Sequence, residues 1–444
     1  MWLPELDTAN QPTYLALVEA ISTAIRSGEL ACGARLPPQR RLAWALGINP
    51  STVMQAYREA ARRHLVSGEV GRGTYVLADS REASLFLLKQ PPADSERIDL
   101  STNVPVTDAD NRDLSQTLAR LAARGELDAL QSYAPAALVM RGRIAASHWL
   151  QGRGLDWPAS RVLLCAGAQQ GVSAALLSLC EAGEPLLAEA FTAPGIKGAA
   201  RQLRLPLHGV AMDRQGILPE DLDRQVRATG ARVLVLTPCL QNPTGACMDA
   251  ERRARVAEVI ERHGLWLIED DVYGALSDQP PLAQRLPERS LLVTSLSKTV
   301  SPGLRLGVIA GSPQLLARID REAQATNWAV SPLCLAVACE WIEDGTAQRR
   351  LDWQREEVRQ RWRLATRLLG PRMPQQPAAP HLWLQAAGGA SLAAACRAAG
   401  VEGAPTEVFA VGHAPLNAVR ISLAAARSRT ELKRALERVV EHWP

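Results

Sequence analysis

Six short apolar runs separated by helical patterns constrain the fold of this chain more than any other feature. The runs are 161–167, 185–190, 232–238, 265–270, 291–297 and 307–311. Nearly continuous apolar runs are typical of strands that are buried on both faces, as in a mostly parallel sheet. Helical patterns alternate with these runs, for example at 249–263. The sequence therefore predicts an α/β domain built around such a sheet.

A smaller subdomain should follow this sheet. One long helical pattern covers 346–370, and short strand patterns lie around 381–386 and 418–423. A last helical pattern covers 429–442. Together these segments predict a small carboxy-terminal α+β subdomain, so that the complete large domain spans 98–444.

Residues 1–78 have a different pattern. One amphipathic helix is predicted within 13–30, and a short second helix should end at Gly47, which suits a left-handed C-cap. Asn49 is a good N-cap for a third helix, and the Pro that follows it fits the first helical turn. A Gly-rich hairpin at 67–76 comes next. Helices followed by such a hairpin predict a winged helix-turn-helix.

The third helix should bury one face and expose the other. Val53, Tyr57 and Ala60 fall on one face, which we expect to be buried. Polar side chains then point outward at the amino-terminal half of the helix, where a DNA-recognition helix meets base edges. These residues are Asn49, Ser51, Thr52 and Gln55.

Positive charge is concentrated in the same unit. The full chain carries a net charge of only +4, but 35–72 contains seven Arg against two acidic residues, a net +5. Neutralisation of DNA phosphates by such groups supplies most non-specific affinity, and contacts to base edges add specificity. The first 78 residues are therefore predicted to bind DNA.

Three motifs that occur in order relate this unit to a known family. The strings L-P-x-x-R-x-L-A-x-x-L-G, T-V-x-x-A-Y and G-x-G-T-Y-V occur in order within 12–77. They resemble the winged helix of the GntR family. The resemblance implies that Arg40 contacts a DNA phosphate and that Arg72 contacts DNA from the wing. Many members of that family have Arg near the start of the recognition helix, where this chain has Pro50, so the bases that are read are not predicted.

The remaining composition bears on compartment and cofactors. Residues 79–97 mix charge, Pro and a short apolar run, which suits a linker. The eight cysteines contain no C-x-x-C, which argues against zinc or a disulfide framework and fits a reducing compartment, so no metal is expected. The longest uncharged window, 162–180, contains Gly, Gln and Ser and indicates strand, turn and helix, not a membrane span. No secretory signal is visible at the start. We expect a cytoplasmic protein, associated with the nucleoid and without a membrane partner.

Three chemically distinct side chains accompany successive apolar runs. Asn242, Asp270 and Lys298 are spaced 28 residues apart. That spacing suits strand–helix–strand repeats and puts all three at the carboxyl edge of the sheet, where open α/β folds bind ligands. A Lys amine can form a Schiff base with pyridoxal 5'-phosphate, and a carboxylate can pair with its pyridine nitrogen. A turn entering a helix, as at 167–170, can hold its phosphate. The sequence therefore predicts a site for this cofactor.

Four strings extend this prediction to a family. N-P-T-G, E-D-D-V-Y, S-L-S-K-T-V-S-P-G-L-R-L-G and V-R-I-S-L together resemble the fold-type I aminotransferases over nearly all of the large domain. The resemblance implies that Lys298 forms the Schiff base and that Asp270 pairs with the pyridine nitrogen. It also implies that Asn242 and Tyr273 contact the phenolate oxygen, while Arg420 binds the α-carboxylate of an amino acid. The implied phosphate ligands are Ala168, Gln169, Ser295 and Arg305, with Tyr133 reaching the site of the partner subunit.

Two details depart from a simple match. The family segment that corresponds to 189–195 usually has Tyr before Pro-Gly, and that Tyr stacks on the cofactor ring. This chain has Ala193 there, so Phe191 or another side chain is the candidate replacement. Ser295-x-x-Lys298 also matches the serine motif of β-lactamases, but S-D-N, K-T-G and an export signal are absent, which disfavours that interpretation.

A GntR-type winged helix followed by an aminotransferase-like domain resembles the MocR subfamily of regulators, including its PdxR and GabR branches. The resemblance implies a homodimer that binds an operator in double-stranded DNA and holds pyridoxal phosphate. It also implies a response to the cofactor, an amine or an amino acid. Two alternatives stay open: a working aminotransferase with an accessory DNA-binding module, and a regulator whose large domain is a cofactor-free dimerisation scaffold.

Overall fold

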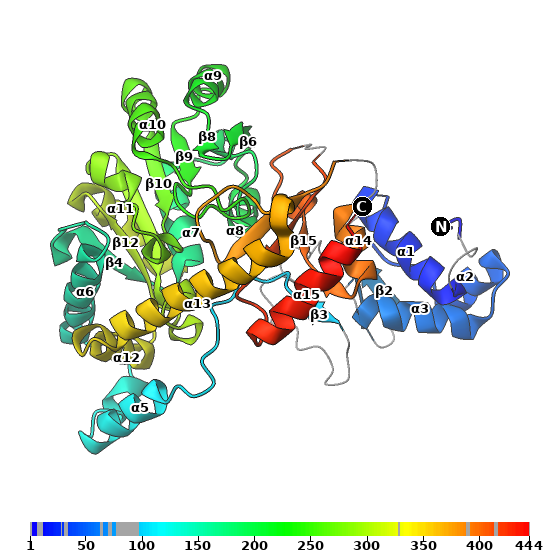
Figure 1. Ribbon diagram of the computed structural model, residues 1–444, viewed down its shortest axis with the longest axis horizontal. Helices are drawn as coiled ribbons and strands as arrows, with labels where there is room; N and C mark the ends of the chain where they lie inside the picture. Colours follow the sequence, from blue (N-terminus) through cyan, green and yellow to red (C-terminus); the bar gives the residue numbers. More distant parts are fainter. Residues whose placement is uncertain are drawn as a thin grey trace. The chain divides into compact units, whose positions relative to one another are not determined.

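The computed structural model describes residues 2–6, 12–27, 29–30, 34–62, 65–69, 73–76, 97–326, 329–387, 391–412 and 416–443. The chain forms two compact units, Met1–Leu88 and Lys89–Pro444 (Figure 1). Most of the predicted linker 79–97 and the predicted wing residue Arg72 lie outside the described residues.

The first unit contains three helices and a hairpin. The helices are α1 (Thr13–Ser27), α2 (Gln39–Leu46) and α3 (Pro50–Arg62). The strands β1 (Val66–Glu69) and β2 (Gly73–Val76) pair in antiparallel fashion, with Val66 opposite Val76. The predicted helix-turn-helix with a wing is therefore confirmed in the described parts of this unit.

The core of the first unit follows the predicted pattern. Val53, Tyr57 and Ala60 of α3 are buried, as expected for the inner face of that helix. They pack with residues of α1 and α2, namely Leu17, Val18, Ile21, Leu42 and Ala43. Gly47 closes α2 in the left-handed conformation, with φ of 65°, which confirms the predicted C-cap.

A seven-stranded sheet forms the centre of the second unit, with the order β4-β12-β11-β10-β9-β5-β6 among the described residues. Its strands are β4 (Val162–Cys165), β5 (Leu186–Glu189), β6 (Leu207–Val210), β9 (Val233–Leu236), β10 (Trp266–Asp270), β11 (Ser290–Ser295) and β12 (Gly307–Gly311). Only β12 runs antiparallel to its neighbours. The mostly parallel sheet is thus confirmed, while the edge strand β6 was not predicted because Leu-His-Gly-Val is not a continuous apolar run.

Helices cover both faces of this sheet (Figure 1). Alternate residues of a strand point to opposite faces, and in β9 Val235 packs toward one layer while Leu234 packs toward the other. The first layer contains α7 (Ala168–Leu179), α8 (Pro194–Gln202) and α11 (Pro313–Thr326); the second contains α9 (Pro219–Thr229) and α10 (Ala250–His263). None of the helices in the described part of the chain is both long and apolar enough to cross a membrane.

The predicted smaller subdomain lies at the carboxy-terminal end. The helix α13 (Thr346–Leu369) leads into it. Its antiparallel sheet has the order β13-β16-β15, and two helices pack on that sheet. The bounds are β13 (His381–Gln385), β15 (Ala404–Pro405), β16 (Ala418–Ser422), α14 (Leu392–Ala398) and α15 (Arg429–Glu441). A short parallel pair, β3 (Ile98–Asp99) with β14 (Val401–Glu402), joins the start of the second unit to this subdomain.

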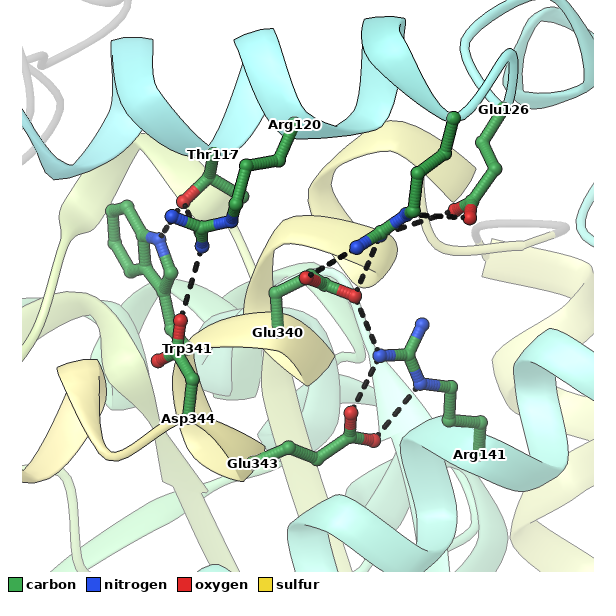
Figure 2. A network of polar contacts seen from close by, with 9 residues as sticks. Thr117, Arg120, Glu126, Arg141, Glu340, Trp341, Glu343 and Asp344 are labelled. Carbon is green, nitrogen blue, oxygen red and sulfur yellow. Dashed lines mark hydrogen bonds and ion pairs between the residues drawn. The ribbon is translucent and has the colours of Figure 1, made fainter.

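Hydrogen bonds and ion pairs connect α12 (Pro332–Glu343) to the end of α5 (Asp113–Ala123) and to α6 (Ala136–Gln151) (Figure 2). Glu340 of α12 accepts hydrogen bonds from both Arg124 and Arg141, at 2.9 and 2.8 Å. Such exposed ion pairs contribute little individually. The buried indole of Trp341, which donates to Thr117 Oγ1 at 2.9 Å, anchors the contact.

Candidate functional site

The carboxyl ends of β4, β5, β9, β10 and β11 lie at one edge of the sheet. Asp270 is the last residue of β10, and Lys298 ends a short 3₁₀ turn that follows β11. Asn242 lies in the loop after β9. The chain therefore places the three residues at the edge that the sequence spacing predicts.

Lys298 extends toward the first segment of the second unit. Its Nζ donates a hydrogen bond of 2.6 Å to the backbone oxygen of Asn103. Burial and the charge of Arg420, opposed in part by the charge of Asp270, together lower the pKa of this amine to about 8. Because only the neutral amine is nucleophilic, this environment makes Lys298 reactive near neutral pH.

Asp270 is placed to meet a cationic or protonated nitrogen. Burial raises the pKa of its carboxyl to about 6, while a hydrogen bond from the Val272 N–H to Oδ1 and the charge of Lys298 lower it. At neutral pH the group is therefore mainly ionised at the sheet edge, which suits a carboxylate that pairs with a pyridine nitrogen.

The predicted phenolate ligand Tyr273 belongs to a buried triad with Asn103 and His381. Asn103 Nδ2 donates to the Tyr273 hydroxyl at 3.1 Å and contacts His381 Nδ1 at 3.0 Å. His381 Nε2 lies 2.9 Å from the backbone oxygen of Gln241. Burial lowers the pKa of His381 to about 3, so the ring is neutral, accepting at Nδ1 and donating at Nε2. Among the residues that the structure describes, Asn103 Oδ1 has no hydrogen-bond partner and is left as an acceptor in the site.

Arg420 is buried, and its charge acts on Tyr273 and His381 of this triad. Its Nη1 donates to Asn242 Oδ1 at 2.7 Å, and its Nη2 donates to the backbone oxygen of Ser101. The guanidinium lies over the ring of Phe409, 4.9 Å from the centroid, and its Nε has no hydrogen-bond partner in the described part of the chain. Burial lowers the pKa of Arg420 to about 10, but the group remains charged at neutral pH.

The amino terminus of α7 lies beside the guanidinium of Arg305. Gly167 precedes the helix with φ of +89°, and a Cβ there would come within 2.6 Å of Arg305 Nη2. Arg305 Nη2 donates to the Ala166 oxygen at 3.3 Å. The first N–H groups of a helix lack intrahelical partners, so this end of α7 suits a phosphate.

The other predicted phosphate ligands lie around the same turn. Ala168 and Gln169 begin α7, and Gln169 Nε2 donates to the Gly195 oxygen at 2.9 Å. Ser295 Oγ accepts the N–H of Ser297 at 3.3 Å. The buried hydroxyls of Ser297 and Thr299 form no hydrogen bond to any residue described in the structure, so they can still bond to a ligand.

An aromatic cluster includes Phe191, two residues before the position where the family has its ring-stacking Tyr. Ala193 is the N-cap of α8 and offers no ring. Phe191 packs against Trp383, with centroids 5.9 Å apart, and Trp383 meets Phe409 edge-on at 5.7 Å. Phe191 and Trp383 also line a cavity of about 660 Å³ together with Thr244 of the N-P-T-G turn.

The predicted DNA-facing residues lie on α2 and α3. Arg40, Ser51 and Gln55 are exposed, and Thr52 is half-buried. Asn49 Oδ1 accepts the N–H of Ser51 at 2.9 Å, which confirms the predicted N-cap. Ser51 Oγ also donates to Asn49 Oδ1, at 2.8 Å, so the side chains of Asn49 and Ser51 hold each other at the start of α3.

Sequence reasoning missed several residues of the site. Asn103, His381 and Trp383 contact residues that were predicted, yet none belongs to a recognised string. Tyr133, predicted to serve a partner subunit, is strongly exposed just before α6.

Comparison with known proteins covers both units. Residues 95–439 match the family model of aminotransferases class I and II, and residues 13–76 match that of bacterial regulatory proteins of the gntR family. The chain is 29% identical over 442 residues to YdeF, an uncharacterized HTH-type transcriptional regulator of Bacillus subtilis, covering 98% of this chain and 95% of that protein. It is 28% identical over 385 residues to the pyridoxine biosynthesis regulator PdxR of Corynebacterium glutamicum, covering 83% and 82%.

The fold also has solved counterparts. The crystal structure of LysN, an α-aminoadipate aminotransferase of Thermus thermophilus complexed with N-(5'-phosphopyridoxyl)-L-leucine, superposes with a TM-score of 0.71 at 21% identity. The match covers 78% of this chain and 92% of LysN. The second unit therefore has the fold of the fold-type I aminotransferases.

Proposed function

Since this chain belongs to the class I and II aminotransferase family and carries a gntR-family domain ahead of it, we propose that it regulates transcription through a ligand of its large domain. This order of domains is that of the MocR-type regulators, and PdxR shares it over most of its length. The first unit binds DNA, and the second is a pyridoxal-phosphate-binding fold. A DNA-bound regulator works in the cytoplasm, at the nucleoid.

The residues of the site fit pyridoxal phosphate on their own chemistry. A half-buried amine with a lowered pKa, a carboxyl at a strand end and a helix amino terminus beside an Arg match its aldehyde, its pyridine nitrogen and its phosphate. The hydroxyls of Ser297 and Thr299, which bond to none of the described residues, can donate hydrogen bonds to further oxygen atoms of the cofactor. When bound, the cofactor supplies an electrophilic aldehyde and an electron-withdrawing ring.

Lys298 carries this proposal. A Lys side chain is strongly hydrated and is buried only at a cost, unless it is paired or reactive. Here Nζ meets one backbone oxygen, of Asn103, and its pKa is lowered to about 8. We infer that Lys298 binds the cofactor, that Asp270 pairs with the ring nitrogen, and that Asn242 and Tyr273 contact the phenolate oxygen.

The proposed response to a ligand depends on the contacts that Lys298 and Arg420 make at the site. Lys298 would hold the cofactor, and a ligand amine would compete with its Nζ for that group, while a ligand carboxylate would compete with Asn242 for Arg420. Either event changes contacts that join the sheet edge to β16 of the small subdomain. A difference in ligand affinity between two arrangements of the chain then biases DNA binding.

We also infer a homodimer, supported by exposed apolar side chains on α6. Met140 and Ile144 are 50% and 57% exposed and, four residues apart, lie on the same face of the helix. Tyr133 lies just before this helix. Clustered apolar exposure is typical of interfaces. Ile144→Asp should give a monomer in light scattering, while Met54→Asp in the first unit should not; an unchanged mass for Ile144→Asp would argue against this interface.

A working aminotransferase is the second candidate, because Asp270, Lys298 and Arg420 are the groups that transamination needs. Sustained turnover of an amino donor with a 2-oxo acid would favour it. Without turnover, the regulatory proposal stands.

Selection of genomic DNA fragments by the purified protein, with and without pyridoxal phosphate at near-physiological salt, tests the regulatory function. A discrete fragment whose recovery changes with the cofactor is the expected result. Lys298→Ala should still recover that fragment but lose the cofactor response. Diffuse, salt-sensitive binding alone would contradict the proposal, because only non-specific phosphate contacts would then be acting.

A further inference from the structure

The loop between β9 and α10 is closed at its base by backbone hydrogen bonds. Met248 N–H donates to the Pro238 oxygen at 2.9 Å, and Gln241 N–H donates to the Ala246 oxygen at 3.0 Å. These bonds hold the two arms of the loop side by side. Asn242, which contacts Arg420, lies at the turn between the arms.

Two cysteines face each other across this base. Cys239 Sγ and Cys247 Sγ are 3.0 Å apart. Cys239 is buried and Cys247 is half-buried, and both are free thiols. A disulfide has an S–S length of about 2.05 Å, so an approach of about 1 Å would join them. The loop geometry therefore already holds the two sulfurs near bonding distance.

The surroundings distinguish the two thiols. The hydrogen bond with Cys239 lowers the pKa of the Cys247 thiol to about 6, helped by the Leu240 N–H and the charge of Arg253 and opposed by burial. The same hydrogen bond, burial and the charge of Asp271 raise the pKa of Cys239. The Ser277 side chain lowers the pKa of both thiols. Cys247 is thus the more exposed sulfur and the one with thiolate character, which is the combination that makes a cysteine oxidisable.

We propose that Cys239 and Cys247 form a reversible disulfide in the folded protein when it meets a peroxide, and that this bond alters the loop that carries Asn242. The modification itself is independent of the proposed function. Its consequence for the cofactor rests on that function.

The chemistry balances with hydrogen peroxide as oxidant. The Cys247 thiolate attacks one peroxide oxygen, the O–O bond breaks, and the hydroxide that leaves takes up a proton to become water. Cys239, losing its proton, then attacks the sulfur of the resulting sulfenic acid, and the S–O bond breaks with loss of a second water. The two sulfurs together lose two electrons, which reduce one peroxide to two waters. A dithiol reductant reverses the change by exchange.

The loop connects the sulfurs to the site through short contacts. Gln241 Nε2 donates to the Phe191 oxygen at 2.7 Å, and Asn242 accepts from Arg420 at 2.7 Å. Drawing the loop base together by about 1 Å would lengthen at least one of these bonds. Loss of one hydrogen bond to a charged group changes affinity by about tenfold, so the oxidised protein should bind pyridoxal phosphate more weakly by about that factor.

Peptide mapping tests the disulfide directly. Trypsin should release 233–252 as one peptide, which contains Cys239 and Cys247 and no other cysteine. After peroxide treatment, alkylation and digestion of the folded protein, this peptide should be lighter by two hydrogens and carry no alkyl group. Cys247→Ser and Cys239→Ser should each prevent this product, whereas Cys180→Ser, at a half-buried thiol whose pKa burial raises to about 11, should not. Full alkylation of the peptide after treatment, or oxidation of Cys180 at an equal rate, would overturn the proposal.

A cofactor titration of the reduced and oxidised protein, followed by absorbance, tests the consequence. The oxidised protein should need about ten times more pyridoxal phosphate for half-saturation, and a dithiol should restore the first value. Equal titrations with the disulfide in place would show that the bond does not reach the site. Absence of binding even in the reduced protein would instead refute the proposed cofactor function and leave the peptide result intact.

Discussion

Arg420 Nη1 donates a 2.7 Å hydrogen bond to Asn242 Oδ1 across 178 positions of sequence. Asn242 belongs to the loop at the sheet edge, and Arg420 belongs to β16 of the small subdomain. The residue predicted to hold a ligand carboxylate is therefore engaged by the residue predicted to contact the cofactor oxygen. A carboxylate ligand must compete with the Asn242 side chain for this guanidinium.

Substitution Arg420→Lys should weaken ligands that have a carboxylate and spare simple amines. Lys offers a point charge where Arg offers a planar fork, so bidentate binding is lost, at a cost of about tenfold in half-saturating concentration. Absorbance titrations of the cofactor-loaded protein with an amino acid and with its decarboxylated amine measure the difference. Equal weakening of both ligands would mean that Arg420 acts on the structure of the site and not on the carboxylate.

Cofactor uptake should depend on pH through Lys298. Because burial lowers the pKa of this amine to about 8, the reactive neutral form increases between pH 7 and 9. The rate of pyridoxal phosphate uptake, followed by absorbance at several pH values, should therefore rise and level off near pH 9. An unperturbed Lys would instead keep rising toward its usual pKa of about 10.4. Lys298→Ala should lose the uptake at every pH.

Local pattern was sufficient to predict every strand of the sheet except β6, and the strand-end residues. Buried parallel strands need apolar side chains on both faces, so β9, β10 and β11 are visible as apolar runs, and Asn242, Asp270 and Lys298 are placed by them. The same holds for the caps Gly47 and Asn49, whose roles depend on backbone geometry a few residues away.

Long-range polar contacts were not predictable in this way. Asn103 follows a two-residue strand and meets Tyr273 and His381, which are 170 and 278 positions away. A single Asn carries no periodic signal, and its partner is chosen only when the small subdomain packs on the sheet. The absence of a C-x-x-C argued against a disulfide framework, and the eight-residue spacing of Cys239 and Cys247 has no motif, whereas the hydrogen-bonded loop brings these two sulfurs together.

The buried ion pair of Arg153 and Asp271 should contribute far more to stability than the exposed pair of Arg120 and Asp344. The first pair is bidentate, at 2.9 and 3.0 Å, with side chains only 5% and 2% exposed. Arg153→Ala leaves Asp271 buried without a countercharge and should cost about 3–5 kcal/mol. Arg120→Ala removes two hydrogen bonds of the network in Figure 2, those to Thr117 and Asp344, and should cost less than about 1 kcal/mol.

Urea denaturation followed by tryptophan fluorescence measures both variants against the parent protein. Similar midpoints for Arg153→Ala and Arg120→Ala would show that water or another donor replaces Arg153. Arg153→Ala combined with Asp271→Asn should recover part of the loss, because no buried charge is then left unpaired.

Two exposed residues of the first unit should affect DNA binding in different ways. Arg40 on α2 offers charge to a phosphate, so Arg40→Ala should weaken binding to all sequences and reduce the dependence of log affinity on log salt by about 1. Gln55 on α3 offers an amide to a base edge, so Gln55→Ala should cost about 1–3 kcal/mol on the selected fragment and little on unrelated DNA. Arg262→Ala, an exposed Arg of the second unit, should change neither value. Anisotropy titrations of both DNAs at several salt concentrations distinguish the cases, and a uniform loss for Gln55→Ala would remove it from base recognition.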